Sequence, residues 1–352
     1  MKVKKNKANI PIADLLAKID ELISEENFSL AEKFVLKALQ AGPENPKALF
    51  KAAVVNFELG NPEPAILYLK RCVAIEPESG YEKYMYLGQM STEHDAIACY
   101  SKGIEILTKD AAKIIQNDSK LQEIKKTIAE AYVSMTEIYL SDLCFESDAE
   151  QKCESFLDLG KQAFPDSPLV YQTLASVRIS QARPEEAKEA LVYSISLWKE
   201  LDPGHPQIPS YENRLALVRL LIECQMIDDS LVLLSFLQKE DDQTVDLWYL
   251  YGWIYYLQGL ELSDTDTSFE KKEMWAESAL CIEKALKIAS FGEYCDSGVV
   301  EHSKQLVNEI YNVYSKAEIK NFTKNEDIEY ANLDGNDDVD WDTQSESEMD
   351  IN

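Results

Sequence analysis

The sequence predicts an all-α chain built from repeated pairs of helices, and three observations support this. Hydrophobic residues make up 45% of the chain, which is enough for a well-buried core. A group of small or apolar residues that ends in a proline recurs after 34 positions. Its members are Ala31, Val35, Ala38 and Pro43, then Ala65, Leu69, Cys72 and Pro77. Similar groups follow along the chain, so we expect one repeated helix-pair unit.

A period of 34 residues with this spacing is typical of the second helix of a tetratricopeptide repeat. Small side chains let the paired helices approach closely, and the proline ends the unit because it cannot continue a helix. We expect about seven helix pairs in a right-handed superhelix over residues 11–320. The first helices should line a concave groove. A closing helix from Val299 to about Ile319 should cover the apolar face of the last repeat.

Two of the expected units are irregular. In the segment Tyr84–Gly103, only eight positions separate Gly88 from Ala96, where a regular unit has about twelve. About one helical turn is therefore missing. The next unit should have a long first helix over 121–140 and a long loop over 141–149.

The later units are more regular. Their first and second helices are marked by apolar groups, and the last unit carries an insertion near 262–269. These groups are Tyr171, Leu174 and Ala175 with Ala187, Leu191 and Ser194; Arg214, Leu217 and Val218 with Ser230, Leu234 and Leu237; and Trp248, Tyr251, Gly252 and Tyr255 with Ser278, Ile282 and Ala285.

The two ends of the chain differ from the repeats. Residues 1–10 form a basic tail with four lysines among the first seven residues, which suits a solvated tail or a weak nuclear-import signal. Residues 325–352 contain eleven acidic residues and no Lys or Arg, so we expect an acidic disordered tail. Trp341 is isolated there, and either docks on a partner or has no role.

Charge narrows the class of partner. A formal net charge of −28 argues against nucleic acid and anionic membranes and favours a basic protein, although acidity also serves solubility. The seven cysteines include no C-x-x-C pair. With no secretory signal and no apolar run of about 18 residues, they predict reduced thiols in an intracellular protein that does not span a membrane.

The chain offers no arrangement that indicates catalysis. His94, His205 and His302 lie far apart, and none has a second ligand at metal-binding spacing. Phosphate-binding, nucleophile-elbow and dinucleotide glycine motifs are all missing from the sequence. We therefore expect neither an enzyme nor a cofactor nor a bound metal.

Six aromatic residues between Trp248 and Tyr256 form two stripes on the expected helix. Trp248, Tyr251 and Tyr255 match the packing signature of the repeat. Tyr249, Trp253 and Tyr256 fall on groove-facing places of the same helix, with Asp246 beside them. Some of these rings could instead be core residues of a tight superhelix.

Carboxylates occupy further groove-facing places, where they either face solvent or await a cation. Together with the second stripe they form the candidate partner-binding set: Glu82, Glu130, Glu137, Glu212, Glu223, Asp246, Tyr249, Trp253 and Tyr256. Arginine suits both kinds of residue through cation–π stacking and charge-assisted hydrogen bonds. Lys47 and Arg219 are isolated cations, so a clamp for acidic peptides is disfavoured.

Three stretches carry a more specific resemblance: Tyr84–Gln89 with the shortened unit after it, Tyr211–Glu223, and Asp246–Gly259. Together with the acidic, tryptophan-containing tail, they resemble the dedicated assembly chaperones of large-subunit ribosomal protein four. The resemblance implies a chaperone that covers the basic internal loop of this ribosomal protein and escorts it from the cytoplasm to the nucleus.

We expect a monomer that binds this ribosomal protein, with a nuclear import receptor as a candidate further partner. The carboxylates would replace RNA phosphates, and the rings of the second stripe would replace stacked bases. The alternative is a tetratricopeptide scaffold or adaptor in another assembly, which would bind a folded partner with little dependence on salt.

Overall fold

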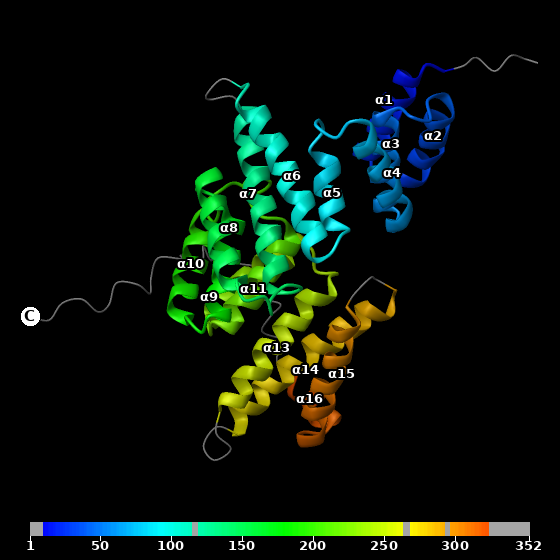
Figure 1. Cartoon of the computed structure of the whole chain (residues 1–352). Helices are drawn as coiled ribbons and strands as arrows, with labels where there is room; N and C mark the ends of the chain where they lie inside the picture. The colour runs from blue at the N-terminus through cyan, green and yellow to red at the C-terminus, as the bar shows by residue number, and fades with distance from the viewer. Residues whose placement is uncertain (1–9, 115–118, 263–267, 293–295, 324–352) are drawn as a thin grey trace, which may run out of the picture. The chain divides into compact units, whose positions relative to one another are not determined.

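The computed structural model describes residues 10–114, 119–262, 268–292 and 296–323, and all regular secondary structure within them is helical (Figure 1). The chain divides into two compact units, Met1–Pro209 and Ser210–Asn352. The first unit holds α1 (Ile12–Ser24), α2 (Phe28–Ala41), α3 (Pro46–Glu58), α4 (Pro62–Ile75), α5 (Glu82–Gln89), α6 (Glu93–Ala111), α7 (Ser119–Leu140), α8 (Ala149–Ala163), α9 (Pro168–Ser180) and α10 (Pro184–Ser196). The second holds α11 (Tyr211–Glu223), α12 (Ile227–Glu240), α13 (Val245–Glu261), α14 (Ser268–Ser290), α15 (Ser297–Val313) and α16 (Lys316–Thr323).

The seven expected helix pairs are confirmed: α1 to α14 pack two by two in chain order. Four of the turns inside these pairs have three residues and share one geometry, in which the middle residue has a positive φ angle. These residues are Glu26, Gly60, Ala182 and Gln225. In each turn, three backbone N–H groups donate to carbonyls of the preceding helix, as from Asn27 to Leu22 at 2.8 Å. This ending satisfies the free carbonyls of the first helix and reverses the chain within three residues.

Small residues lie where the paired helices touch, as the 34-residue period predicts. Ala31, Ala38 and Ala65 are fully buried. In the last pair, a Cβ atom added to Gly252 would lie 2.5 Å from Ile282 Cδ1, so only glycine permits this approach of α13 to α14. The buried Ser278 hydroxyl donates to the Gly252 carbonyl at 2.7 Å, which satisfies a polar group within the same contact.

Both irregular units have the form that the sequence predicts. Helix α5 has only eight residues, and Gly88 near its end lies under the Tyr100 ring of α6. Helix α7 extends over 22 residues before the long loop that leads to α8. The lengths of α5 and α7 depart from the regular repeat, and the spacing of glycine and apolar residues in the sequence predicts them.

The closing helix differs from the prediction of one helix over 299–319. The chain forms two helices, α15 and α16, with extended backbone at Tyr314 between them. The break is stabilised by Glu318, whose carboxylate accepts hydrogen bonds from the backbone N–H and hydroxyl of Ser315, at 2.9 and 2.6 Å. Both helices bury apolar residues against the last pair, including Leu306, Ile310 and Ile319.

The two predicted tails lie outside the described residues, except for Ile10 at the start of the chain's described part. The disorder expected for residues 325–352 and the docking of Trp341 remain predictions. So does the continuous superhelix over 11–320, because each of the two compact units has its own packing.

Candidate functional site

The second aromatic stripe of α13 is covered by α15. Tyr249 is hydrogen-bonded to His302 Nδ1 at 2.9 Å, and the Trp253 ring lies edge-on to the His302 ring at 5.1 Å between centroids. Tyr256 is buried, and its hydroxyl donates to the Glu309 carboxylate at 2.5 Å. Burial, and then this carboxylate, raise the pKa of Tyr256 to about 12. The three rings therefore have partners within the fold, and their contact with a client remains a prediction.

Sequence reasoning missed His302 and Glu309 as neighbours of this stripe. The signal was present, because the two residues are seven positions apart and therefore share one face of a helix. That face could only be matched to α13 once the order of packing around the last pair was known. Tyr256 is the clearest case, because its repeat position predicts a groove-facing ring, whereas the ring is buried, stacks on Trp275 of α14 and is hydrogen-bonded to Glu309 of α15.

The first aromatic stripe packs within the second unit, as its repeat positions predict. Tyr251 is buried, and its ring lies 5.7 Å from Trp248 and 6.4 Å from Tyr255. Trp248 donates its indole N–H to the Asp242 carbonyl at 2.6 Å. The Lys284 ammonium lies over the Trp248 ring, 3.5 Å from its centroid. These contacts give this stripe a structural role.

An acidic pocket of about 480 Å³ lies between α11, the end of α12 and the start of α13. Its lining residues are Tyr211, Glu212, Leu215, Arg219, Glu240, Asp241, Thr244 and Asp246. Two candidate acids, Glu212 and Asp246, thus share one pocket. Glu223 is exposed at the far end of α11 and does not line it.

Charge within this pocket is only partly balanced. Arg219 forms an ion pair with Asp246. Arg214, which does not line the pocket, forms an ion pair with Glu240 at 2.8 Å. Tyr211 donates its hydroxyl to the Asp241 carbonyl at 2.9 Å, which joins α11 to the end of α12. Four carboxylates face one lining guanidinium, so the pocket favours a cationic guest.

Two candidate acids on α7 lie in an environment that disfavours charge. Desolvation by surrounding protein raises the pKa of Glu130 and the pKa of Glu137, although Glu130 is only half-buried and Glu137 is exposed. Lys126 lies 3.9 Å from Glu130 and offsets part of this. Glu137 has no cation within 4 Å among the described residues. The charged form of such a carboxylate is stabilised most when a cation from another molecule approaches it.

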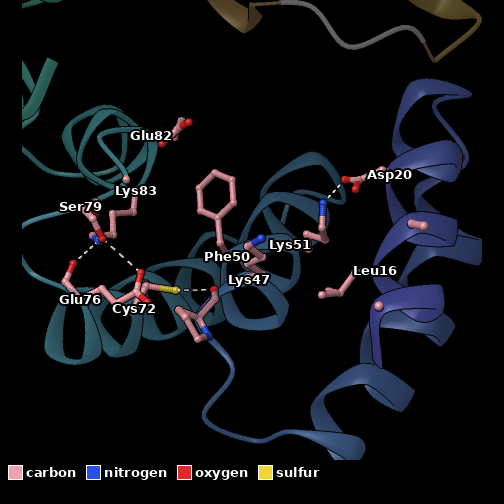
Figure 2. A pocket seen from close by; sticks show the side chains of 14 residues that line it. Leu16, Asp20, Lys47, Phe50, Lys51, Cys72, Glu76, Ser79, Glu82 and Lys83 are labelled. Carbon is pink, nitrogen blue, oxygen red and sulfur yellow. Dashed lines mark hydrogen bonds and ion pairs between the residues drawn. The ribbon is translucent and has the colours of Figure 1, made fainter. Parts of the chain in front are cut away.

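A second, larger pocket of about 630 Å³ lies in the first unit, among α1, α3, α4 and the start of α5 (Figure 2). Glu82 lines this pocket, but so do Lys47, Lys51 and Lys83. Lys51 pairs with Asp20, and the buried Lys83 ammonium donates to backbone carbonyls of Glu76 and Ser79. The surroundings of Glu82 are therefore of mixed charge, unlike the acidic groove that the sequence predicts there.

The described residues include neither a helix that could span a membrane nor a cluster of metal-ligating side chains. None of their helices is both long and apolar enough to cross a bilayer. Within the same residues, no three His, Cys, Asp or Glu side chains come together in a way that could hold a metal ion.

Comparison with known proteins agrees with this architecture. A family model for the tetratricopeptide repeat matches residues 46–79, which include α3 and α4. A solved structure of the assembly chaperone of RpL4 (Acl4), residues 1–338, is 31% identical and superposes with a TM-score of 0.65. It covers 72% of this chain and 98% of that one.

Two curated relatives extend the likeness to most of the chain. A probable assembly chaperone of rpl4 from Schizosaccharomyces pombe is 32% identical over 96% of this chain and 98% of its own length. A protein of the same description from Emericella nidulans is 31% identical over 79% of this chain and 75% of its own length. Together with the helix pairs described above, these relatives show that the chain belongs to the family of assembly chaperones of rpl4.

Proposed function

We propose that this protein is a dedicated chaperone that binds newly made rpl4, a basic protein of the large ribosomal subunit, before assembly. The observation that carries this proposal is the relationship to the Schizosaccharomyces pombe chaperone, which extends over 96% of the chain. A binding role is consistent with a fold of helix pairs in which two described pockets are lined by charged and apolar side chains.

The geometry supports a way of holding such a client. Glu137 and Glu130 on α7, and Glu212 and Asp246 around the second-unit pocket, present carboxylates with few cations beside them. A Lys/Arg-rich segment would supply those cations and form charge-assisted hydrogen bonds. While bound, its charges could not attract nucleic acid, so the carboxylates would take the part that RNA phosphates take later.

Further parts of this proposal concern the cell. The protein would accompany rpl4 from the cytoplasm to the nucleus as a monomer, together with a nuclear import receptor, and would release it to the assembling subunit. It would contact neither nucleic acid nor membrane itself, which the net charge of −28 supports.

A salt titration tests the proposal. Affinity for a peptide with the most Lys/Arg-rich segment of rpl4 should fall steeply as salt rises, because exposed charge pairs are screened. Asp246→Lys and Glu137→Lys should each weaken binding by about tenfold or more, close to 1.4 kcal/mol. Glu189→Lys, at an exposed position of α10, changes the net charge equally and should have a much smaller effect.

Two results would contradict the proposal: no binding of rpl4 by the unaltered protein, or equal effects of all three substitutions. Capture from cell extract gives an independent answer. Recovery of rpl4 without other ribosomal proteins supports a dedicated chaperone, whereas a folded partner bound without salt dependence indicates a scaffold.

A further inference from the structure

Phe145 is the most exposed large apolar side chain in the described part of the chain. It lies in the loop between α7 and α8, and 99% of its surface is accessible to solvent. Burying a phenylalanine ring is worth about 1.5–3 kcal/mol, so an exposed ring is a source of binding energy that the fold itself does not use. Single exposed apolar residues are common, so the surroundings of the ring decide whether it has a use.

The backbone on both sides of Phe145 is fixed. Leu143 is buried in the core between α7 and α8, and its N–H donates to the Ile138 carbonyl at 3.0 Å. On the other side, the Glu146 N–H donates to the Leu143 carbonyl at 3.1 Å. The ring therefore projects from a closed turn with both ends attached to the core.

Neighbouring helix pairs brace the same loop. Glu146 is bonded through its carboxylate to His94 Nε2, at the start of α6, at 2.7 Å. Just beyond the loop, Glu150 accepts a hydrogen bond from the Gln181 side chain, in the turn between α9 and α10, at 2.9 Å. Docking onto a loop that is already ordered costs little conformational entropy, which favours affinity.

The charges around the ring indicate the kind of partner. Asp142, Glu146, Asp148 and Glu150 lie within five positions of Phe145. Among the described residues, Lys152 lies 4.0 Å from Asp148, and His94 contacts Glu146 of the loop. The loop thus combines an exposed aromatic ring with carboxylates close to it in sequence, and its complement is a basic surface with an apolar hollow.

We propose that this Phe145 loop (residues 141–148) is a second docking surface, which binds the folded part of the basic client. An extended Lys/Arg-rich segment has no hollow to receive a phenyl ring, whereas a folded basic protein can offer one. The inference rests on the proposed function, since it takes rpl4 as the partner. It adds a contact that is separate from the carboxylates of α7 and of the second-unit pocket.

The test compares two ligands with one variant. Phe145→Ser should weaken binding of full-length rpl4 by about tenfold and leave binding of the isolated Lys/Arg-rich peptide unchanged. Phe145→Trp should keep the affinity for full-length rpl4, because a large aromatic ring remains. Phe291→Ser removes another exposed ring, in the second unit, and should change neither affinity.

Each other outcome has a definite meaning. Equal affinity of Phe145→Ser and the unaltered protein for full-length rpl4 would overturn the docking surface. Loss of affinity for both ligands would also overturn it, since Phe145 would then contact the extended segment. If the unaltered protein binds neither ligand, it is the proposed function that fails. Since the Phe145 and Phe291 side chains are both largely exposed among the described residues, circular dichroism should show an unchanged fold in all variants.

Discussion

Arg219 on α11 forms an ion pair with Asp246 on α13, and both side chains line the acidic pocket of the second unit. Arg219 is also the only cation among the residues that line it in the described structure. An arginine of the protein itself therefore occupies a carboxylate that a client arginine would use. Both side chains keep contact with water, so the pair is weak enough to be exchanged.

The first prediction is that Arg219→Gln tightens binding of the Lys/Arg-rich rpl4 peptide by about three- to tenfold. Removing the guanidinium frees Asp246 to pair with a cation of the client. One such partly exposed ion pair contributes about 1 kcal/mol. Isothermal titration at low salt measures the change. Arg183→Gln, which breaks an exposed pair with Glu186 in the first unit, is the matched control and should have little effect. Weaker binding by Arg219→Gln would show instead that Arg219 contacts the client.

The second prediction concerns the closest helix contact. Gly252→Ala should lower the free energy of unfolding of the second unit by about 1–3 kcal/mol, because the new methyl group overlaps the fully buried Ile282 and approaches the Ser278 carbonyl. Urea denaturation measures this change.

Gly103→Ala provides the comparison for that substitution. There the methyl group overlaps the flexible end of Met85, which can move aside, and lies at an ordinary contact distance of 3.5 Å from Tyr84 Cβ. The higher helix propensity of alanine should then keep Gly103→Ala close to neutral. Equal losses in the two variants would show that helix packing does not decide the outcome.

Sequence reasoning predicted most of the fold, because its signals are local and repeated. Gly88 and Ala96 give the missing turn of α5, and the run that ends at Leu140 gives the length of α7. The break between α15 and α16 was missed since it depends on Glu318, which accepts two hydrogen bonds from Ser315. These hydrogen bonds favour a break in the helix, whereas the continuous apolar pattern favours one helix. Residue spacing alone does not show which of the two prevails.

The candidate site was harder to predict, because it depends on which helix covers which face. Repeat positions assigned Glu212 and Asp246 to the first helices of successive pairs, and the structure places both in the lining of one pocket. They could not show that His302 and Glu309 would lie on the second aromatic stripe. Nor could they place Lys51 near Glu82, because the two side chains come from different helices, α3 and α5.

The third prediction separates structure from binding in the aromatic stripe. Trp253→Ala should lower the free energy of unfolding by about 2–4 kcal/mol, because the ring stacks on Tyr256 and contacts His302. Tyr256→Phe should cost about 1 kcal/mol, as it removes the hydrogen bond to the exposed Glu309. If the stripe also binds the client, peptide affinity should fall in Trp253→Ala and not in Tyr256→Phe. Unchanged affinity in both variants would assign the stripe to structure alone.

The fourth prediction follows from the position of Glu137. Burial raises the pKa of this carboxyl group in the folded state above its value near 4.3 in the unfolded chain, so its charged form opposes folding at neutral pH. Glu137→Gln should therefore stabilise the protein at pH 7.5, by no more than about 1 kcal/mol because the side chain is partly screened by solvent. The gain should shrink as pH falls through the raised pKa, and should vanish below about 4.3, where the carboxyl group is neutral in both states.

Urea denaturation at pH 7.5 and pH 4 tests this relationship, with Glu189→Gln as the control on an exposed face of α10. The control should change stability little at either pH. The same Glu137→Gln substitution should weaken binding of the rpl4 peptide, because it removes a carboxylate that has no ion-pair partner among the described residues of the free protein. A variant that is more stable yet binds less well is expected where a charge is retained for a partner at the expense of the fold. If Glu137→Gln is less stable at pH 7.5, the carboxylate has a structural partner and this account of α7 is wrong.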